Sequence, residues 1–144
     1  MRTLSSFSSR FCSTDFFFFF LELEKAINPL LSGDPQLAFQ HVLKKILEDV
    51  NSMRSSHIFQ RPVERRNFPD YYDRVKTPIC INDIQEKVNK GGYTKKADFI
   101  ADFALIHKNS VEYNGRRSEY SAKALELLNV VKKALKNYKD YVID

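Results

Sequence analysis

Four separate segments of the chain carry apolar side chains at alternating spacings of three and four residues. This spacing is typical of a helix that buries one face. The clearest example is expected to run from Ser118 toward Val142. Its stripe is Leu125, Leu128, Val131, Leu135, Tyr138 and Val142. Because four segments share this period, the sequence predicts an all-α fold, a left-handed four-helix bundle.

Residues that favour helix starts precede the other three stripes. Asp34 is a suitable N-cap and Pro35 suits the first helical position, where a backbone N–H is not needed. Asn82 and Thr94 are the expected starts of the next two helices. The three stripes are Phe39, Leu43, Ile46, Val50 and Met53; then Ile81, Ile84 and Val88; then Phe99, Phe103, Ile106 and Ser110.

Composition divides the chain into three parts. Residues 1–20 are rich in serine and hold seven of the twelve phenylalanines, so we expect a disordered or artefactual N-terminal segment. Residues 21–33 resemble a short linker helix, and residues 34–144 form the predicted helical domain. No apolar run approaches the length that a membrane span requires, so no membrane partner is expected.

The sequence offers no pattern for catalysis or for a bound metal. His41, His57 and His107 are scattered, and Cys12 and Cys80 lie in unlike contexts. There is no glycine-rich phosphate loop and no motif around a serine or cysteine nucleophile. We therefore predict a protein that is not an enzyme and that has no catalytic residue, no cofactor and no metal. The net charge of +5 allows DNA contact, but only weakly.

A long segment without helical periodicity separates the first two stripes, from Arg54 to about Ile79. It contains Pro62, Pro69 and Pro78. Connections of this length in a compact domain are usually functional or disordered. Many apolar and aromatic residues interrupt this one, which argues against disorder. We predict that the segment is ordered and forms one wall of a binding site.

The last two helices meet at a short corner that contains Asn114-Gly115. Asn and Gly commonly end helices, and Ser118 can start the next one, so the simplest interpretation is a turn alone. Aromatic residues around the amide favour a binding pocket instead. A bundle with a long first connection and a short last one can bring both to the same end. The predicted pocket lining is Val63, Phe68, Tyr71, Tyr113 and Tyr120, with Asn114 as a directed amide.

Such a pocket suits an amide ligand. Acetylation removes the charge of lysine and leaves a small amide on an apolar stem. Asn114 could donate a hydrogen bond to the acetyl carbonyl, and the Tyr71 hydroxyl could hold a bridging water. Unmodified lysine would be rejected because its ammonium group would lose hydration in an apolar site. These considerations fit acetyl-lysine but do not select it over other amides.

Several of these residues together resemble the bromodomain family. The matching residues, in family order and spacing, are Phe59, Pro62-Val63, Pro69-Asp70-Tyr71-Tyr72, Thr77-Pro78, Tyr93, Phe99 and Asn109-Ser110-Val111-Glu112-Tyr113-Asn114. In addition, residues 23–31 resemble the segment that joins two tandem bromodomains in one family member. Asn114-Gly115 and Tyr120 resemble the second of those two modules. The resemblance covers residues 21–144 and implies that residues 34–144 form a bromodomain.

The resemblance implies a role for each candidate residue. Asn114 would be the anchoring asparagine and Tyr71 the water-holding tyrosine. Tyr113 would line the pocket and Tyr120 would guard its mouth. The two remaining wall residues would be Phe59 and Val63. The implied function is a nuclear acetyl-lysine reader in transcription initiation or chromatin regulation, whose partners are acetylated histone peptides and transcription initiation complex proteins.

Four positions depart from the family pattern. His57-Ile58 replaces the usual Trp-Pro, Asn67 replaces an apolar lining residue, and Cys80 replaces a helix-capping aspartate. Two alternatives therefore remain beside the reader. The first is a degenerate bromodomain that serves as a protein–protein scaffold. The second is a basic helical module that binds nucleic acid through the lysines of the last helix.

Overall fold

The computed structural model describes residues 33–140, and every regular element within them is helical. Segment 1–20 and nearly all of the expected linker helix at 21–33 lie outside this range. The elements are α4 (Pro35–Ser52), the 3₁₀ helix η1 (Arg54–Phe59), α5 (Tyr71–Arg74), α6 (Ile81–Asn89), α7 (Lys96–Asn114) and α8 (Glu119–Leu135). None of these helices combines the length and the apolarity needed to cross a membrane.

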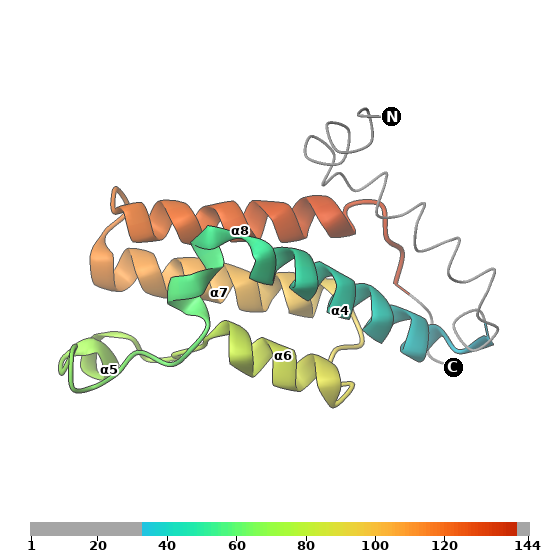
Figure 1. Ribbon diagram of the computed structural model, residues 1–144, viewed down its shortest axis with the longest axis horizontal. Coiled ribbons are helices and arrows are strands. Elements are labelled where there is room, and N and C mark those ends of the chain that lie inside the picture. Colours follow the sequence, from blue (N-terminus) through green and yellow to red (C-terminus); the bar gives the residue numbers. More distant parts are fainter. Residues whose placement is uncertain (1–32, 141–144) are drawn as a thin grey trace.

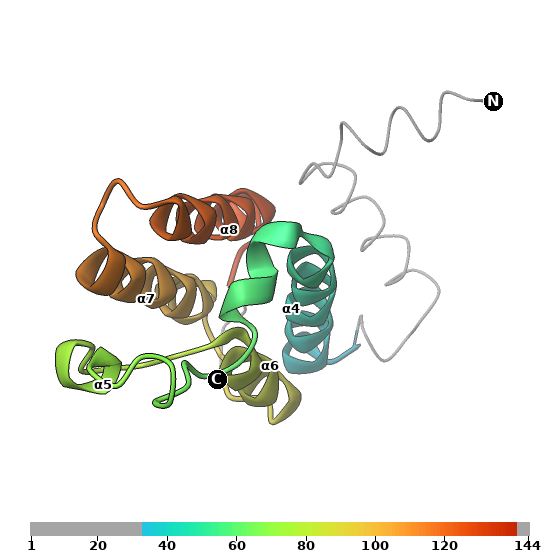
Figure 2. The ribbon, with the colours of Figure 1, turned by 60° about the vertical axis from the view of Figure 1, so that its left-hand side comes forward.

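The four longer helices form a bundle. Helices α7 and α8 lie side by side and antiparallel, and α4 and α6 pack on the same side of that pair (Figures 1 and 2). The prediction of an all-α four-helix fold is therefore confirmed. Both views also place the loop around α5 and the α7–α8 corner at the same end of the bundle. The two segments that were expected to build a site are thus neighbours in space.

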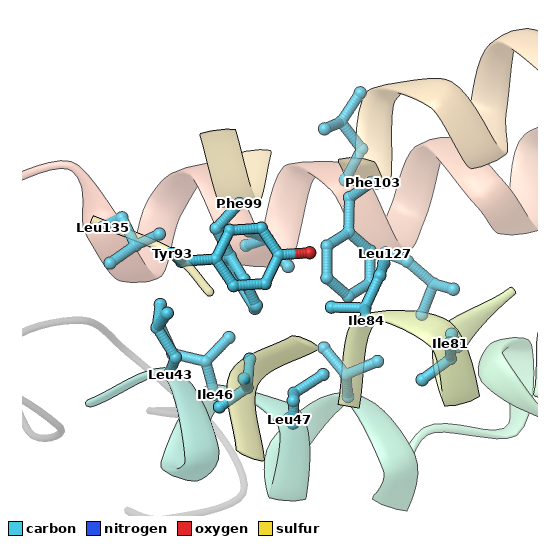
Figure 3. Close-up of a cluster of buried hydrophobic side chains, with 14 of the residues drawn as sticks. Leu43, Ile46, Leu47, Ile81, Ile84, Tyr93, Phe99, Phe103, Leu127 and Leu135 are labelled. Carbon is cyan, nitrogen blue, oxygen red and sulfur yellow. The ribbon is translucent and has the colours of Figure 1, made fainter. Parts of the chain in front are cut away.

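All four helices contribute to one apolar core (Figure 3). The predicted stripes of α4, α6 and α7 are confirmed, with Met53 only partly buried. Tyr93, from the connection between α6 and α7, inserts its ring against Phe99, with ring centroids 5.3 Å apart. Its hydroxyl donates a hydrogen bond to Asp102 at the edge of the core. Burial and this carboxylate raise the pKa of Tyr93.

The predicted stripe of the last helix was wrong at Leu125, which is 41% exposed. The buried face of α8 consists of Ser121, Ala124, Leu127, Leu128, Val131 and Leu135. The predicted length was wrong as well, because α8 ends at Leu135, although Tyr138 is buried as expected. Lys96 Nζ donates hydrogen bonds to the carbonyls of Leu135 and Tyr138, at 3.0 and 2.5 Å. The chain leaves the helix there, and Tyr138 packs on Phe39. Val142 lies outside the described residues.

The start of α6 also differs from the prediction. The helix begins at Ile81 with Cys80 as its N-cap, and not at Asn82. Asp83 explains the difference, because its carboxylate accepts a hydrogen bond from the Cys80 backbone N–H at 3.0 Å. The carboxylate also lies 3.3 Å from Cys80 Sγ. The aspartate in the first turn therefore compensates for a weak thiol cap.

The other helix starts give one confirmation and one correction. Asp34 caps α4 as predicted, and its side chain accepts hydrogen bonds from two backbone N–H groups in the first turn. Thr94 does not cap α7, because the N-cap is Lys95. A distant residue satisfies this terminus: Asp140 accepts a hydrogen bond from the Lys96 backbone N–H at 2.8 Å. The segment after α8 thus closes the end of the bundle away from α5.

Candidate functional site

A cavity of about 570 Å³ lies between the long segment and the α7–α8 corner. All seven residues predicted for the site line it: Phe59, Val63, Phe68, Tyr71, Tyr113, Asn114 and Tyr120. The long segment supplies the first four, α7 supplies Tyr113 and Asn114, and α8 supplies Tyr120. The structure therefore brings together residues that are far apart in the sequence.

Exposed apolar side chains gather around this cavity. Five large hydrophobic residues within positions 33–140 are exposed, and three of them line it: Ile58, Phe68 and Tyr120. Each is 44 to 46% exposed. An apolar patch that remains in water on a folded domain commonly marks a binding surface. The distribution of apolar surface thus points to the same end of the bundle as the cavity does.

Asn114 is held at the corner by a short chain of hydrogen bonds. Its Nδ2 donates a hydrogen bond to Ser110 Oγ at 3.3 Å. Ser110 Oγ lies 3.1 Å from Ser121 Oγ. Ser121 in turn donates to the carbonyl of Gly115 at 2.7 Å. Gly115 has a φ of 93°, a region that glycine occupies far more readily than other residues. One N–H and the oxygen of the Asn114 amide have no partner among the described residues.

Tyr71 lies at the start of α5 and is 9% exposed. The edges and faces of neighbouring rings enclose it, with centroid distances of 5.2 Å to Tyr72 and 4.9 Å to Tyr113. Burial raises the pKa of Tyr71, and the two neighbouring tyrosines raise it further. The side chain is therefore a neutral phenol near neutral pH. Its hydroxyl makes no hydrogen bond to another described residue, so it can serve a ligand or water in the cavity.

Hydrogen bonds between side chains and backbone hold the wall in place. Tyr72 donates from its hydroxyl to the Val63 carbonyl at 2.6 Å. The buried amide of Asn109 donates to the Thr77 carbonyl at 2.8 Å. Sequence reasoning missed the role of Asn109 in fixing the wall. The sequence places Asn109 next to Ser110 of the predicted α7 stripe, but only the structure shows that Asn109 is buried, at 7% exposed, and which carbonyl it contacts.

Tyr113 joins the corner to the wall. Its hydroxyl donates to Asp70 Oδ1 at 2.7 Å, and the edge of its ring meets the Phe68 ring at a centroid distance of 6.2 Å. The hydrogen bond to Asp70 is the main cause that raises the pKa of Tyr113. Cys80 also lines the cavity, and burial raises the pKa of its thiol. Neither group is poised to ionise near neutral pH.

A second cavity, which we call the side cavity, adjoins the first. It has a volume of about 570 Å³ and shares Ile58, Arg61, Pro62, Val63 and Phe68 with the main cavity. His57 and Asn67 line the side cavity and not the main one. The expected replacement of a lining residue by Asn67 therefore falls on the side cavity. Within residues 33–140, no cluster of His, Cys, Asp or Glu could hold a metal ion.

Comparison with known proteins agrees with this geometry. The sequence profile of the bromodomain family matches residues 43–126, more than half of the chain. TFIID subunit 1 of Drosophila melanogaster is 35% identical over 109 residues, which cover 74% of this chain and 5% of that protein. The Caenorhabditis elegans TFIID subunit 1 is 31% identical over 84% of this chain and 7% of its own length. The chain thus spans less than a tenth of either relative.

A solved structure that is similar to this chain belongs to the same family. The bromodomain of human BAZ1A matches with a TM-score of 0.61 at 30% sequence identity. The match covers 66% of this chain and 89% of that one. A further relative, subunit NURF301 of a nucleosome-remodelling factor from Drosophila melanogaster, is 33% identical over 71% of this chain and 4% of its own length. The chain belongs to the bromodomain family.

Proposed function

We propose that this domain is an acetyl-lysine reader. One observation carries the proposal: Asn114 presents an amide with unpaired groups at an apolar cavity that all seven predicted residues line. An acetyl-lysine side chain has the complementary shape and chemistry, because an apolar stem ends in a small neutral amide. Asn114 donates to the acetyl oxygen, and Tyr71 binds it through a water molecule.

Discrimination follows from the surroundings of the amide. The cavity is lined mostly by apolar and aromatic groups, and an unmodified ammonium would lose its water there without gaining a partner. A ligand that leaves the Asn114 amide desolvated and unpaired would lose about 1–3 kcal/mol. Phe59 and Val63 contact the stem, Tyr113 closes one side, and Tyr120 covers the mouth. No catalytic step, cofactor or metal is part of this function.

The relatives suggest the setting. Their names identify a transcription initiation factor and a nucleosome-remodelling factor. We therefore propose that the partners are acetylated histone tails and proteins of the transcription initiation complex, in the nucleus. Residues 23–31 resemble the segment that joins the two tandem bromodomains of TFIID subunit 1, and Asn114-Gly115 and Tyr120 resemble the second of them. On this basis we propose that the chain corresponds to that second module.

A titration tests the reader function. Matched histone peptides, one acetylated and one not, are added to the wild-type domain, to Asn114→Ala and to Asn129→Ala. The control residue Asn129 is an exposed asparagine in the middle of α8 and does not line the cavity. Binding of the acetylated peptide alone, lost in Asn114→Ala and kept in Asn129→Ala, supports the proposal. Equal binding by the wild type and Asn114→Ala rejects the role of Asn114.

The same titration decides between the two alternatives. A degenerate scaffold would melt cooperatively and yet bind no acetylated peptide. A nucleic-acid module would bind DNA regardless of acetylation, and its affinity would fall steeply with salt. The intact amide and the open cavity favour the reader over the scaffold.

A further inference from the structure

Most of the net positive charge of the chain lies in the wall of the cavity. Residues 54–79 carry six Arg or Lys side chains and three Asp or Glu side chains, so their net charge is +3. The whole chain has a net charge of +5. A cavity with a wall of one sign concentrates ligands of the opposite sign. The lining itself holds one cation, Arg61, and one anion, Asp83, so the excess of positive charge lies in the segment around the cavity and not in its lining.

Two of these cations are held over rings that line the cavity. The Arg65 guanidinium lies 4.4 Å from the centroid of the Tyr72 ring, and that of Arg74 lies 5.0 Å from the Tyr113 ring. Arg74 also donates to the Glu112 carbonyl at 3.1 Å. A guanidinium that stacks on an aromatic face keeps its N–H edge available and loses little further freedom on binding. Both arginines are thus preorganised for an anion.

The acidic side chains around the cavity are engaged with neutral donors. Asp70 accepts from the Tyr113 hydroxyl, and Glu64 accepts from the Asn67 amide at 3.1 Å. Every ion pair recorded within residues 33–140 uses a lysine: Lys45–Glu48, Lys87–Asp102 and Lys90–Glu86. No arginine of the wall is therefore neutralised by an acid from the part of the chain that the structure describes.

The side cavity gives the rest of a bound peptide a place to lie. It shares a wall with the main cavity, and Arg61 lines both. Glu64 lines the side cavity, while Arg65 and Arg74 line neither cavity. A peptide whose acetyl-lysine fills the main cavity would lay a neighbouring residue across this shared wall. Carboxylate and phosphate groups match the planar fork of an arginine, because both can accept two parallel hydrogen bonds. The neighbouring residue that fits this surface best is therefore anionic.

We propose that this domain prefers acetyl-lysine flanked by an anionic side chain, held by Arg61 at the shared wall, with Arg65 and Arg74 adding positive charge beside the rings of Tyr72 and Tyr113. The anion is either a carboxylate of Asp or Glu or the phosphoryl group of a phosphoserine. The preference rests on the proposed reader function and narrows it. A basic, unphosphorylated tail segment is the weaker ligand, and an acidic or phosphorylated segment is the stronger one.

Four peptides that share one acetyl-lysine test this preference. Their flanks are acidic, phosphoserine-containing, neutral or basic, and each has an unacetylated twin. We expect the two anionic peptides to bind about three- to tenfold more tightly than the neutral one at low salt. The basic peptide should bind more weakly than the neutral one. The differences should shrink as salt screens the exposed charges. Comparison of the two anionic peptides shows which anion the site takes.

Charge-neutral variants identify the residues responsible. Arg65→Gln should reduce the advantage of the anionic peptides and leave the neutral peptide almost unaffected. Arg61→Gln should reduce that advantage by more than it weakens the neutral peptide, because Arg61 also lines the main cavity. Lys132→Gln removes the same charge from α8, about 18 Å along the helix from Tyr120, and should change nothing. Arg74 is left intact because it also bonds to the Glu112 carbonyl. Thermal melting checks that each variant is folded.

The outcomes separate this inference from the reader function. If all acetylated peptides bind equally, the flank preference is overturned and the reader stands. If a folded domain binds none of them, the reader function fails first. If an unacetylated acidic peptide binds as well as its acetylated twin, the arginines act as a separate anion site and the preference is overturned. If a DNA duplex displaces the acidic peptide and binds with higher affinity than the peptide does, the arginines serve nucleic acid instead, and the preference is overturned.

Discussion

The core and the cavity wall are held together in different ways. The core contains side chains such as Phe99, Phe103 and Leu127, each at most 1% exposed, and apolar burial accounts for its stability. In the wall, residues 54–79, only Tyr71 and Val75 are buried apolar side chains. Directional hydrogen bonds to backbone carbonyls and ring contacts hold the wall instead.

This difference explains how the domain can keep apolar surface exposed without collapsing over it. A wall that was stabilised by burial would have to fill the cavity with its own side chains. A wall fixed by hydrogen bonds leaves Ile58 and Phe68 exposed to the solvent, where a ligand can cover them together with Tyr120 of α8. Changes in the core should therefore reduce stability, and changes in the wall should reduce binding by more than they reduce stability.

The largest effect is expected from a change in the core. Phe103→Ala should lower the free energy of unfolding by about 3–5 kcal/mol, because it leaves a cavity in a closely packed region. Urea denaturation measures the loss. The remaining folded protein should bind acetylated peptide with unchanged affinity. As a control, Leu125→Ala on the exposed side of α8 should change stability by less than about 0.5 kcal/mol.

A change at the junction of the core and the wall should lower both the stability of the domain and its affinity for peptide. Asn109→Ala removes the buried donor to the Thr77 carbonyl and should cost about 1–3 kcal/mol of stability. The wall should also loosen, so peptide affinity should fall at temperatures where the domain is still folded. Denaturation and peptide titration on the same sample measure the two effects. Unchanged affinity would show that the Asn109 bond does not position the wall.

A change inside the wall should have a smaller effect on stability. Tyr72→Phe keeps the ring but removes the hydrogen bond to the Val63 carbonyl, at a cost of about 0.5–1.5 kcal/mol. Val63 lines the cavity, so the expected loss of peptide affinity should exceed the small loss of stability. Hydrogen exchange of residues around Val63 should become faster than in the wild type. Exchange that accelerated uniformly over the bundle would contradict a local role.

The smallest effect is expected from alkaline pH. Burial raises the pKa of Tyr71, so the folded state holds the phenol proton more tightly than the unfolded chain does. In the unfolded chain the pKa of tyrosine is about 10. This contribution to stability is fully present below that pH and is lost as the pH rises through the folded pKa. Tyr71→Phe should make the decline in stability above about pH 10 less steep. The pKa of Tyr93 is also raised, so Tyr93 should account for part of the decline in stability with pH that remains in Tyr71→Phe.

The sequence predicted the fold well where a local pattern controls the structure. Apolar spacing located four helices, and Asp34 and Ser118 act as N-caps as expected. Two of the errors come from distant contacts, whereas the start of α6 was missed because of the local contact between Asp83 and Cys80. The end of α8 depends on Lys96, and the start of α7 depends on Asp140, more than forty residues away in the chain. No local pattern carries that information.

The candidate site, like the fold, was predicted from the sequence only in part. Aromatic residues around Asn114 and the family resemblance brought together seven residues that do line one cavity. Their roles in binding remain predictions. The supporting contacts of Asn109 and Tyr72 could not be derived, because each pairs with a backbone carbonyl in a segment without regular structure. The stacking of Arg65 and Arg74 on tyrosine rings likewise depends on the folded path of the wall.

The most direct test of the account observes the Asn114 amide itself. In a ¹⁵N-labelled domain, the side-chain amide signals of Asn114 are followed while an acetylated peptide and its unacetylated twin are added. We predict that the acetylated peptide shifts these signals, together with backbone signals of Tyr71 and Val63, and that the twin does not. If the acetylated peptide binds but shifts residues elsewhere on the bundle, the proposed role of this cavity is contradicted.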